Sequence, residues 1–314
     1  MRLFIARPLP DAVLDAARAA FDVTVRPSNA PMSDAEMIAA LTGYDVVLPT
    51  LGDRFQAPIF AACTPRARLL ANFGVGYNHI DVAAARAAGL QVTNTPGAVT
   101  DATADIALAL MLMSARRAAE GERLVRSGRW EGWHPTQMLG LHLTGKTLGI
   151  VGMGRIGQAI ARRAHFGFDM RVLYHTRSPR AVPGAQPVDS LLALMDQSDV
   201  VVVAVPAAPS THHLIGAREL AAMRPHAHLV NIARGDIVDE AALIAALRER
   251  RIAGAGLDVY EFEPRVPEAL RQLDNVTLLP HLGTAALEVR TQMGLMAVAN
   301  ARAFQRGEPL PNPV

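Results

Sequence analysis

Residues 147–157 read TLGIVGMGRIG, an apolar run followed at once by Gly152, Gly154 and Gly157. A strand that ends in G-x-G-x-x-G and opens a helix is the phosphate-binding turn of a dinucleotide-binding fold. The first glycine allows the tight turn, the second lets the backbone approach a pyrophosphate, and the third allows close packing of helix on strand. Such a pattern standing alone is often a mere turn, but a helical pattern continues here to Ala164. The stretch therefore predicts dinucleotide binding by Gly152, Met153, Gly154, Arg155, Ile156 and Gly157.

The rest of this half of the chain continues the same alternation of strand and helix. Six strand-like apolar runs, with helical patterns between most of them, occupy residues 146–154, 170–175, 198–206, 227–234, 252–260 and 275–281. Six parallel strands with helical crossovers make up a dinucleotide-binding sheet. We therefore predict a Rossmann domain over residues 99–284.

The first hundred residues also alternate, with apolar runs at 3–6, 21–25, 44–49, 67–76 and 91–96. One helix between them is opened by a capping box, Ser33 to Glu36. The helical pattern at 285–304 has no strand of its own nearby, so we predict that it returns to this domain. The predicted fold is α/β, with two Rossmann-like or flavodoxin-like doubly wound parallel-sheet domains and a cleft between them. Residues 1–98 plus 285–314 form the predicted substrate (catalytic) domain.

The segment that joins these two alternations of strand and helix has a different residue pattern. An Ala- and Leu-rich pattern without Pro predicts one long helix from Asp101 to about Ser127. Residues 128–143, GRWEGWHPTQMLGLHL, contain Gly, Pro and Trp and little periodicity, which predicts a loop.

Composition excludes several classes of function. The 314 residues have a formal net charge of +2, and the basic residues are dispersed among acids, so we expect no nucleic-acid partner. No apolar stretch reaches the roughly 18 residues of a membrane span, and we expect no membrane partner. Cys63 stands alone, which is typical of a reducing compartment, and the N-terminus does not resemble a signal peptide. The sequence predicts a cytoplasmic protein.

The residues at the end of the second strand of the predicted dinucleotide domain distinguish NAD from NADP. A site for NAD usually has Asp or Glu about 20 residues after the glycines, to bind the ribose 2′-hydroxyl. This chain has His175, Thr176 and Arg177 there, with Arg180 nearby. Arg177 can pair with a 2′-phosphate, so we predict that NADP(H) is preferred, with NAD(H) as the alternative. The other interpretation is a solvated arginine on a loop.

Three more groups follow strand-like runs. Arg234 can hold a carboxylate by two hydrogen bonds or form a surface ion pair. A carboxylate from 258–263 beside His281 would make that imidazole a general acid toward a ketone oxygen. By contrast, the pairs His212-His213 and His226-x-His228 have no carboxylate or Cys at metal-ligand spacing, so we predict no metal site.

Five motifs in order, NFGVGYNHID, GMGRIG, NIARGDIVDE, GLDVYEFEP and LPHLGTA, closely resemble the D-isomer-specific 2-hydroxyacid dehydrogenases. Within that family they are most similar to the glyoxylate and hydroxypyruvate reductases. The resemblance covers nearly the whole chain. It implies a reductase that converts small 2-oxo acids, glyoxylate and hydroxypyruvate, to 2-hydroxy acids by hydride transfer, and together with Arg177 this predicts an NADPH-preferring reductase.

The resemblance also implies roles for single residues. The catalytic residues would be Arg234 as substrate clamp, Glu263 as the partner of the histidine, and His281 as general acid and base. The backbone amides of Val75 and Gly76 would hold the substrate carboxylate, although a simple turn would look the same in sequence. The positions that line the nicotinamide and its ribose would be Thr103, Pro206, Ile232, Asp258 and Gly283.

Oligomeric state and substrate size rest on the same resemblance. Trp130 and Trp133 resemble a loop that reaches the partner subunit's active site in a homodimer, so Trp133 is a predicted substrate-binding residue. The alternative is that these tryptophans anchor dimer packing.

Two competing functions stay open. Relatives that act on formate, phosphite or phosphoglycerate share the fold, although formate relatives carry Gln where this chain has Glu263. Co-repressors that sense a dinucleotide share even the Arg, Glu and His set, and fold does not exclude them.

Overall fold

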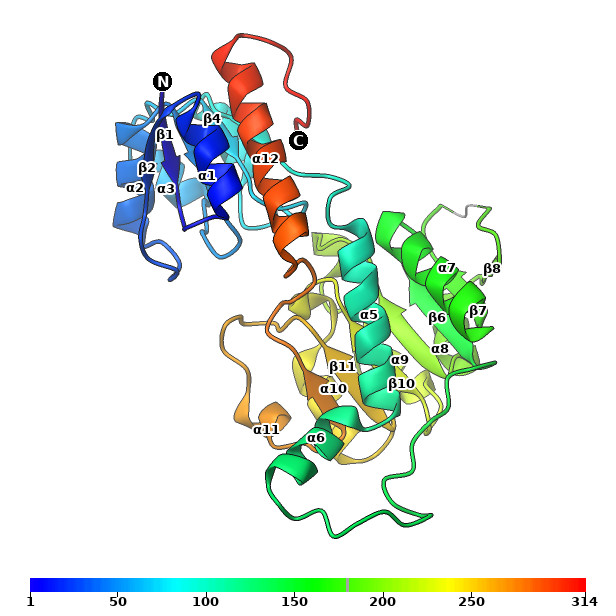
Figure 1. Ribbon diagram of the computed structural model, residues 1–314. Coiled ribbons are helices and arrows are strands. Elements are labelled where there is room, and N and C mark those ends of the chain that lie inside the picture. The colour runs from blue at the N-terminus through cyan, green and yellow to red at the C-terminus, as the bar shows by residue number, and fades with distance from the viewer. Residues whose placement is uncertain (179–180) are drawn as a thin grey trace. The chain divides into compact units, whose positions relative to one another are not determined.

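The computed structural model describes residues 1–178 and 181–314, so Arg180 lies outside the described residues. The chain separates into two compact units. The first consists of Met1–Val99 with Ala285–Val314, and the second of Thr100–Thr284. Figure 1 follows the chain through both.

The first unit is built on a five-stranded parallel sheet in the order β2-β1-β3-β4-β5. This is the flavodoxin-like strand order. The strands are β1 (Arg2–Ile5), β2 (Asp22–Val25), β3 (Val46–Leu48), β4 (Leu69–Ala71) and β5 (Gln91–Thr93). The helices are α1 (Asp11–Arg18), α2 (Asp34–Gly43), α3 (Ala57–Ala61), α4 (Val82–Ala87) and α12 (Leu287–Gln305).

Apolar side chains cover both faces of this sheet. One cluster joins the sheet to α1 and α12, and the other joins it to α2, α3 and α4. The C-terminal helix α12 lies beside α1 (Figure 1), and a Cβ at Gly294 would come within 2.5 Å of Val13 Cγ2. The predicted capping box is confirmed, because Ser33 Oγ accepts from the Glu36 amide and Glu36 Oε2 accepts from the Ser33 amide.

The second unit has a seven-stranded parallel sheet in the order β12-β11-β10-β9-β6-β7-β8. Its strands are β6 (Thr147–Val151), β7 (Arg171–His175), β8 (Ala185–Pro187), β9 (Val200–Val203), β10 (His228–Asn231), β11 (Gly254–Leu257) and β12 (Val276–Leu278). From β8 inward the order is that of a Rossmann sheet with a seventh strand added. The predicted α/β class with two doubly wound parallel sheets is confirmed.

Helices lie on both faces of this second sheet. An apolar cluster on one face includes α5 (Thr100–Ala115) and α7 (Arg155–Phe168). The other face carries α8 (Leu191–Gln197), α9 (Ala217–Ala222), α10 (Glu240–Arg248) and α11 (Glu268–Arg271). Two 3-10 turns, η1 (Pro209–Thr211) and η2 (Gly235–Ile237), follow β9 and β10. Among the residues that the structure describes, no helix combines the length and apolar character that a membrane span requires.

Two predicted elements differ from the structure. The single helix predicted from Asp101 to about Ser127 is wrong: α5 ends at Ala115, and α6 (Ala118–Arg126) starts after Arg117, whose φ is +52°. The carbonyl of Ala115 accepts from the Leu141 amide at 2.8 Å, so the following loop takes the place of the next helical turn. The predicted count of six strands is also wrong, because β8 adds a short strand beside β7.

Candidate functional site

The turn between β6 and α7 has the geometry that its three glycines predict. Gly152 has a φ of +98°, and a Cβ there would come within 2.8 Å of the Ala204 carbonyl. A Cβ at Gly157 would come within 2.2 Å of the Gly152 carbonyl, so helix and turn are in direct contact. Among the described residues, a Cβ at Gly154 would meet nothing within 4 Å, and no side chain caps the first turn of α7. The first amides of α7 are therefore open to an anionic ligand, which fits a dinucleotide pyrophosphate.

The end of β7 lies beside this turn. The Gly152 amide donates to the His175 carbonyl at 2.9 Å, and His175 Nδ1 lies 3.2 Å from the Val188 carbonyl. Thr176 is half-buried and Arg177 is exposed. Residues 175–177, which occupy the position where an NAD site usually has a carboxylate, thus lie at the end of a strand that is hydrogen-bonded to the glycine turn.

Asp258 ties the end of β11 to the loop after β12. It is buried, and its carboxylate accepts from the amides of Leu282 at 2.6 Å and Gly283 at 2.8 Å. The pKa of Asp258 is raised above its ordinary value, chiefly by burial and also by the charge of Glu263. The hydrogen bonds from the two amides and the charge of His281 act in the opposite direction and lower the pKa. Thr103, on α5, donates to the Gly283 carbonyl at 3.3 Å. The fold therefore gathers Thr103, Asp258 and Gly283 in one place, as their predicted common role requires.

The same loops bring the predicted acid and imidazole together. Glu263 Oε2 lies 2.9 Å from His281 Nδ1, and each side chain is about a third exposed, 30% and 28%. The Tyr260 amide donates to the other oxygen of Glu263 at 3.0 Å. His281 has a φ of +57°, and its amide donates to the Asp258 carbonyl at 2.9 Å. The carboxylate thus holds Nδ1 of the ring, and this contact does not involve the other ring nitrogen, Nε2.

The charge of Glu263 is maintained by its neighbours. Burial works against its ionisation, but the hydrogen bond and charge of His281, the Tyr260 amide and the Arg234 guanidinium outweigh it. The pKa of Glu263 is therefore held below its ordinary value. At neutral pH this residue is therefore a carboxylate beside the His281 ring.

Arg234 is held by an unusually close contact between two loops. It follows β10 by three residues, and its Nη1 donates to the Ala233 carbonyl at 2.6 Å. Burial lowers the pKa of this guanidinium, and the charges of Glu263 and Asp236 raise it. A Cβ at Gly235 would come within 1.8 Å of the Tyr260 carbonyl carbon. Only glycine at 235 lets the Arg234 loop and the loop that carries Glu263 lie against each other.

In the first unit, Val75 and Gly76 lie in the loop at 74–76, whose carbonyl groups each accept a hydrogen bond from an asparagine side chain. Asn72 Nδ2 donates to the carbonyls of Gly74 and Gly76 at 3.0 Å each, and Asn94 Nδ2 donates to that of Val75 at 2.9 Å. Within residues 1–178 and 181–314, the backbone hydrogen bonds include no acceptor for the amides of Val75 or Gly76. These two amides are available to a carboxylate.

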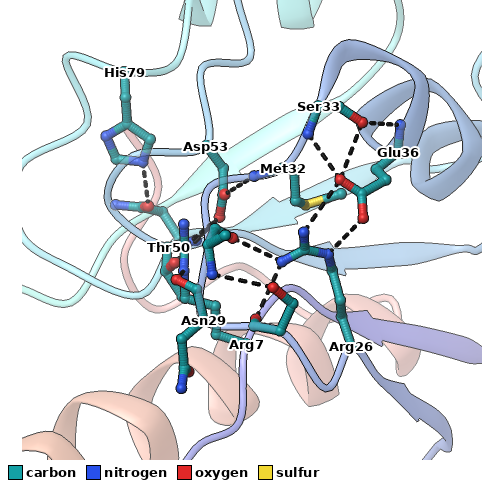
Figure 2. Close-up of polar contacts among 12 residues, drawn as sticks. Arg7, Arg26, Asn29, Met32, Ser33, Glu36, Thr50, Asp53 and His79 are labelled. Atoms are coloured by element: carbon teal, nitrogen blue, oxygen red, sulfur yellow. Dashed lines mark hydrogen bonds and ion pairs between the residues drawn. The ribbon is translucent and has the colours of Figure 1, made fainter. Parts of the chain in front are cut away.

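A buried ion pair supports the same edge of the first sheet (Figure 2). Asp53 is fully buried and accepts from Arg7 Nη1 at 2.7 Å, from the Met32 amide at 3.1 Å and from the Thr50 amide at 2.9 Å. Figure 2 also shows His79, whose Nε2 lies 3.0 Å from Asn72 Oδ1. The Asp53 contacts thereby hold together the loops after β1, β2 and β3, and the His79–Asn72 contact lies within the segment after β4.

The remaining predicted residues lie in three different settings. Ile232 is buried one residue after β10, and Pro206 follows β9, with its carbonyl accepting from Thr211 Oγ1 at 2.9 Å. Trp133 is 79% exposed in the segment between α6 and β6. Val75 and Gly76 belong to the first unit, and the other predicted site residues belong to the second.

Sequence reasoning missed two features. It missed Asn72, whose buried amide shapes the loop at 74–76; the buried position after β4 was the available signal. The second feature concerns His212 and His213, near which the sequence has no carboxylate at metal-ligand spacing. The fold brings Glu261 to them from 48 residues away, with Oε1 3.0 Å from His213 Nε2.

Known proteins resemble this chain over nearly its whole length. The family model described as D-isomer specific 2-hydroxyacid dehydrogenase, NAD binding domain, matches residues 108–283. The chain is 44% identical over 317 residues to the glyoxylate reductase of Thermococcus gammatolerans, covering 99% of this chain and 94% of that one. It is also 44% identical to the glyoxylate reductase of Pyrococcus furiosus, with 98% and 93% covered.

Solved structures give the same result. A protein from Thermus thermophilus matches with a TM-score of 0.93 and 42% identity, with both chains covered completely. An NADPH-dependent glyoxylate/hydroxypyruvate reductase from Sinorhizobium meliloti, solved with NADP and malonate, matches with a TM-score of 0.89 and 37% identity, covering 100% of this chain and 96% of that one. The resemblance seen in the sequence motifs is confirmed: the chain belongs to the D-isomer-specific 2-hydroxyacid dehydrogenases, and it is a nicotinamide-dinucleotide-dependent oxidoreductase.

Proposed function

We propose that this enzyme reduces glyoxylate and hydroxypyruvate to the corresponding 2-hydroxy acids, prefers NADPH, and uses His281 as its general acid and base. The observation that carries the proposal is the 2.9 Å pair of Glu263 and His281, with the charge of Arg234 acting on the same carboxylate. The glyoxylate reductases of two archaea and the NADPH-dependent bacterial reductase support the choice of substrate and cofactor.

The residues present fit a bound nicotinamide dinucleotide. The open amides at the start of α7 and the bare Gly154 would hold its pyrophosphate, and Thr103, Pro206, Ile232, Asp258 and Gly283 would line the nicotinamide and its ribose. When bound, the dihydronicotinamide supplies a hydride to C2 of the oxo acid.

The protein's own groups handle charge and proton. The Arg234 guanidinium stabilises negative charge that develops on the carbonyl oxygen, and the amides of Val75 and Gly76 bind the substrate carboxylate. His281 Nε2 donates a proton to the carbonyl oxygen in reduction and accepts it in the reverse reaction. Glu263 orients the ring and compensates the positive charge of the imidazolium.

The preference for NADPH rests on the end of β7. No carboxylate at 175–177 would repel a 2′-phosphate, and the exposed Arg177 would pair with it. Arg177→Ala should raise the KM for NADPH roughly 10-fold to 100-fold and leave that for NADH nearly unchanged. Arg171→Ala is the matched control, since Arg171 is exposed at the other end of the same strand.

The deciding experiment compares steady-state rates with glyoxylate, hydroxypyruvate and pyruvate, each with NADPH and with NADH, for the wild type and His281→Ala. We expect NADPH with glyoxylate or hydroxypyruvate to give the highest kcat/KM, and the variant to lose at least about 100-fold. Higher efficiency with NADH would overturn the assignment of Arg177. An absence of turnover with any oxo acid would favour a sensor or a different donor.

We also propose that the enzyme is a homodimer in which the segment 128–142 contacts the partner. Trp130, Trp133 and Leu139 in this segment are 51%, 79% and 68% exposed. Large apolar side chains gathered on one exposed segment are typical of an interface. Light scattering should give twice the chain mass, and Trp133→Ala should change kcat/KM for glyoxylate if this side chain reaches the partner's site. A monomer in solution would refute the proposal.

A further inference from the structure

We propose that His212, His213 and Glu261 form a binding site for a divalent transition-metal ion of the zinc class. The three side chains offer two imidazole nitrogens and one carboxylate oxygen, and these ligand atoms all lie within 4.8 Å of one another. Imidazole and carboxylate together suit Zn²⁺ and its transition-metal neighbours, whereas Mg²⁺ prefers oxygen ligands in octahedral geometry.

The distance between the ligand atoms of His213 and Glu261 is close to the one that a tetrahedral ion needs. With zinc bonds of about 2.0 to 2.2 Å, ligand atoms lie roughly 3.3 Å apart. His213 Nε2 and Glu261 Oε1 are 3.0 Å apart. The rings of His212 and His213 are stacked with centroids 4.0 Å apart, and His212 is exposed, so a small rotation of its ring completes the set. Three protein ligands leave the fourth position to water.

The backbone and the surroundings hold two of the three ligands in place. His213 has a φ of +48°, and its amide donates to the Asp236 carbonyl at 2.8 Å, which fixes the direction of the side chain. The Glu261 carboxylate is 14% exposed, and its second oxygen accepts from the Glu240 amide at 3.5 Å, at the start of α10. Such contacts from behind are typical of metal ligands.

The local charge also favours a cation. Glu240 is buried against Glu261, with Glu240 Oε2 3.5 Å from the Glu261 amide. A second carboxyl group therefore lies beside the backbone of Glu261, and a divalent cation would offset the negative charge gathered there. This site is separate in its residues from the proposed substrate and cofactor positions, and it does not rest on the proposed function.

The test is calorimetric titration of the tag-free protein with ZnCl2 and, separately, with MgCl2, in the absence of substrate. We expect one Zn²⁺ per chain, no binding of Mg²⁺, and a rise in Tm of roughly 5 °C at saturating Zn²⁺. His212→Ala and His213→Asn should each weaken Zn²⁺ affinity at least about 10-fold. His212 is exposed, so its replacement should not affect folding.

His226→Gln is the matched control. His226 is a half-exposed histidine paired with one carboxylate, Asp199, at 2.7 Å, but it lies outside the proposed site. Its replacement should leave Zn²⁺ affinity unchanged. Failure of the wild type to bind Zn²⁺, equal binding of Mg²⁺, or unchanged affinity in both His212→Ala and His213→Asn would overturn the assignment. These results are independent of turnover, so they do not depend on which oxo acid the enzyme reduces.

Discussion

Replacing Gly235 with alanine tests whether contact between two loops positions the catalytic groups. The added Cβ would stand 1.8 Å from the Tyr260 carbonyl carbon, 2.1 Å from its oxygen and 2.2 Å from the Glu261 nitrogen. Carbon atoms in contact are about 3.5 Å apart at the closest, so the loops must separate by at least about 1.5 Å. These loops carry Arg234 on one side and Glu263 on the other, and no flexible side-chain end is available to give way.

Such a displacement should affect catalysis more than stability. A misplacement of about 1 Å costs on the order of 100-fold in rate, so kcat/KM for glyoxylate should fall by about that factor. Overpacking costs about 1 to 3 kcal/mol, which corresponds to a fall in Tm of roughly 5 °C for a unit of this size. The assay combines steady-state loss of NADPH absorbance with thermal unfolding followed by circular dichroism.

Gly167→Ala is the matched control for this variant. Gly167 lies in α7, where a Cβ would meet nothing within 4 Å, so the substitution should leave kcat/KM unchanged and Tm equal or slightly higher. If Gly235→Ala keeps kcat/KM within about twofold of wild type, the close contact of these loops does not position Arg234, and the reasoning is wrong.

Three further predictions concern pH and the first-unit loop. Burial, and then the charge of His226, lower the pKa of His228 from 6.5 to about 4, so between these pH values the unfolded chain binds a proton that the folded chain does not. The free energy of unfolding should therefore fall by about 3 kcal/mol as pH drops from 6.5 to 4. His228→Gln should flatten this pH dependence, measured by urea unfolding. Glu263 has a pKa below its ordinary 4.5, so its contribution to stability is present above pH 4.5 and is lost as the pH falls below that value. The Tm of Glu263→Gln should therefore fall less on acidification than the Tm of the wild type. At pH 7 the kcat of this variant should be at least about 100-fold lower. Asn72→Ala removes the side-chain amide that donates to the carbonyls of Gly74 and Gly76, so KM for glyoxylate should rise about 10-fold with a smaller change in kcat, and an unchanged KM would show that Asn72 does not shape the substrate site.

The strands and the phosphate turn could be predicted because they depend on local sequence. Buried parallel strands such as β9, Val-Val-Val-Val, are continuous apolar runs, and the glycines of the turn mark where φ must be positive or space must be left. The break between α5 and α6 could not be predicted, since it depends on the Leu141 amide meeting the Ala115 carbonyl. The strand β8 was missed because it is three residues long, contains Pro187 and lies at the edge of the sheet.

The predicted site residues that follow strands of the second unit lie near one another because parallel strands end at one edge of a sheet. Arg234 follows β10, Asp258 follows β11 and His281 follows β12, so their order in the sheet brings these loops together. The approach of Glu261 to His213 was out of reach, since 48 residues separate them and neither residue has a pattern that points to the other. Local motifs predict loops well, but contacts between loops depend on packing.

The hydrogen bond from Thr103 to the Gly283 carbonyl bears on how the second unit is joined to the rest of the chain. Thr103 lies just after the residue where the chain enters the second unit, and Gly283 lies just before the residue where it leaves. The two ends of the dinucleotide-binding unit are therefore neighbours. A unit with adjacent ends can be inserted into a surface connection of another domain without stretching its host. The same property makes residues 100–284 a natural cassette for excision, circular permutation or transplantation between family members.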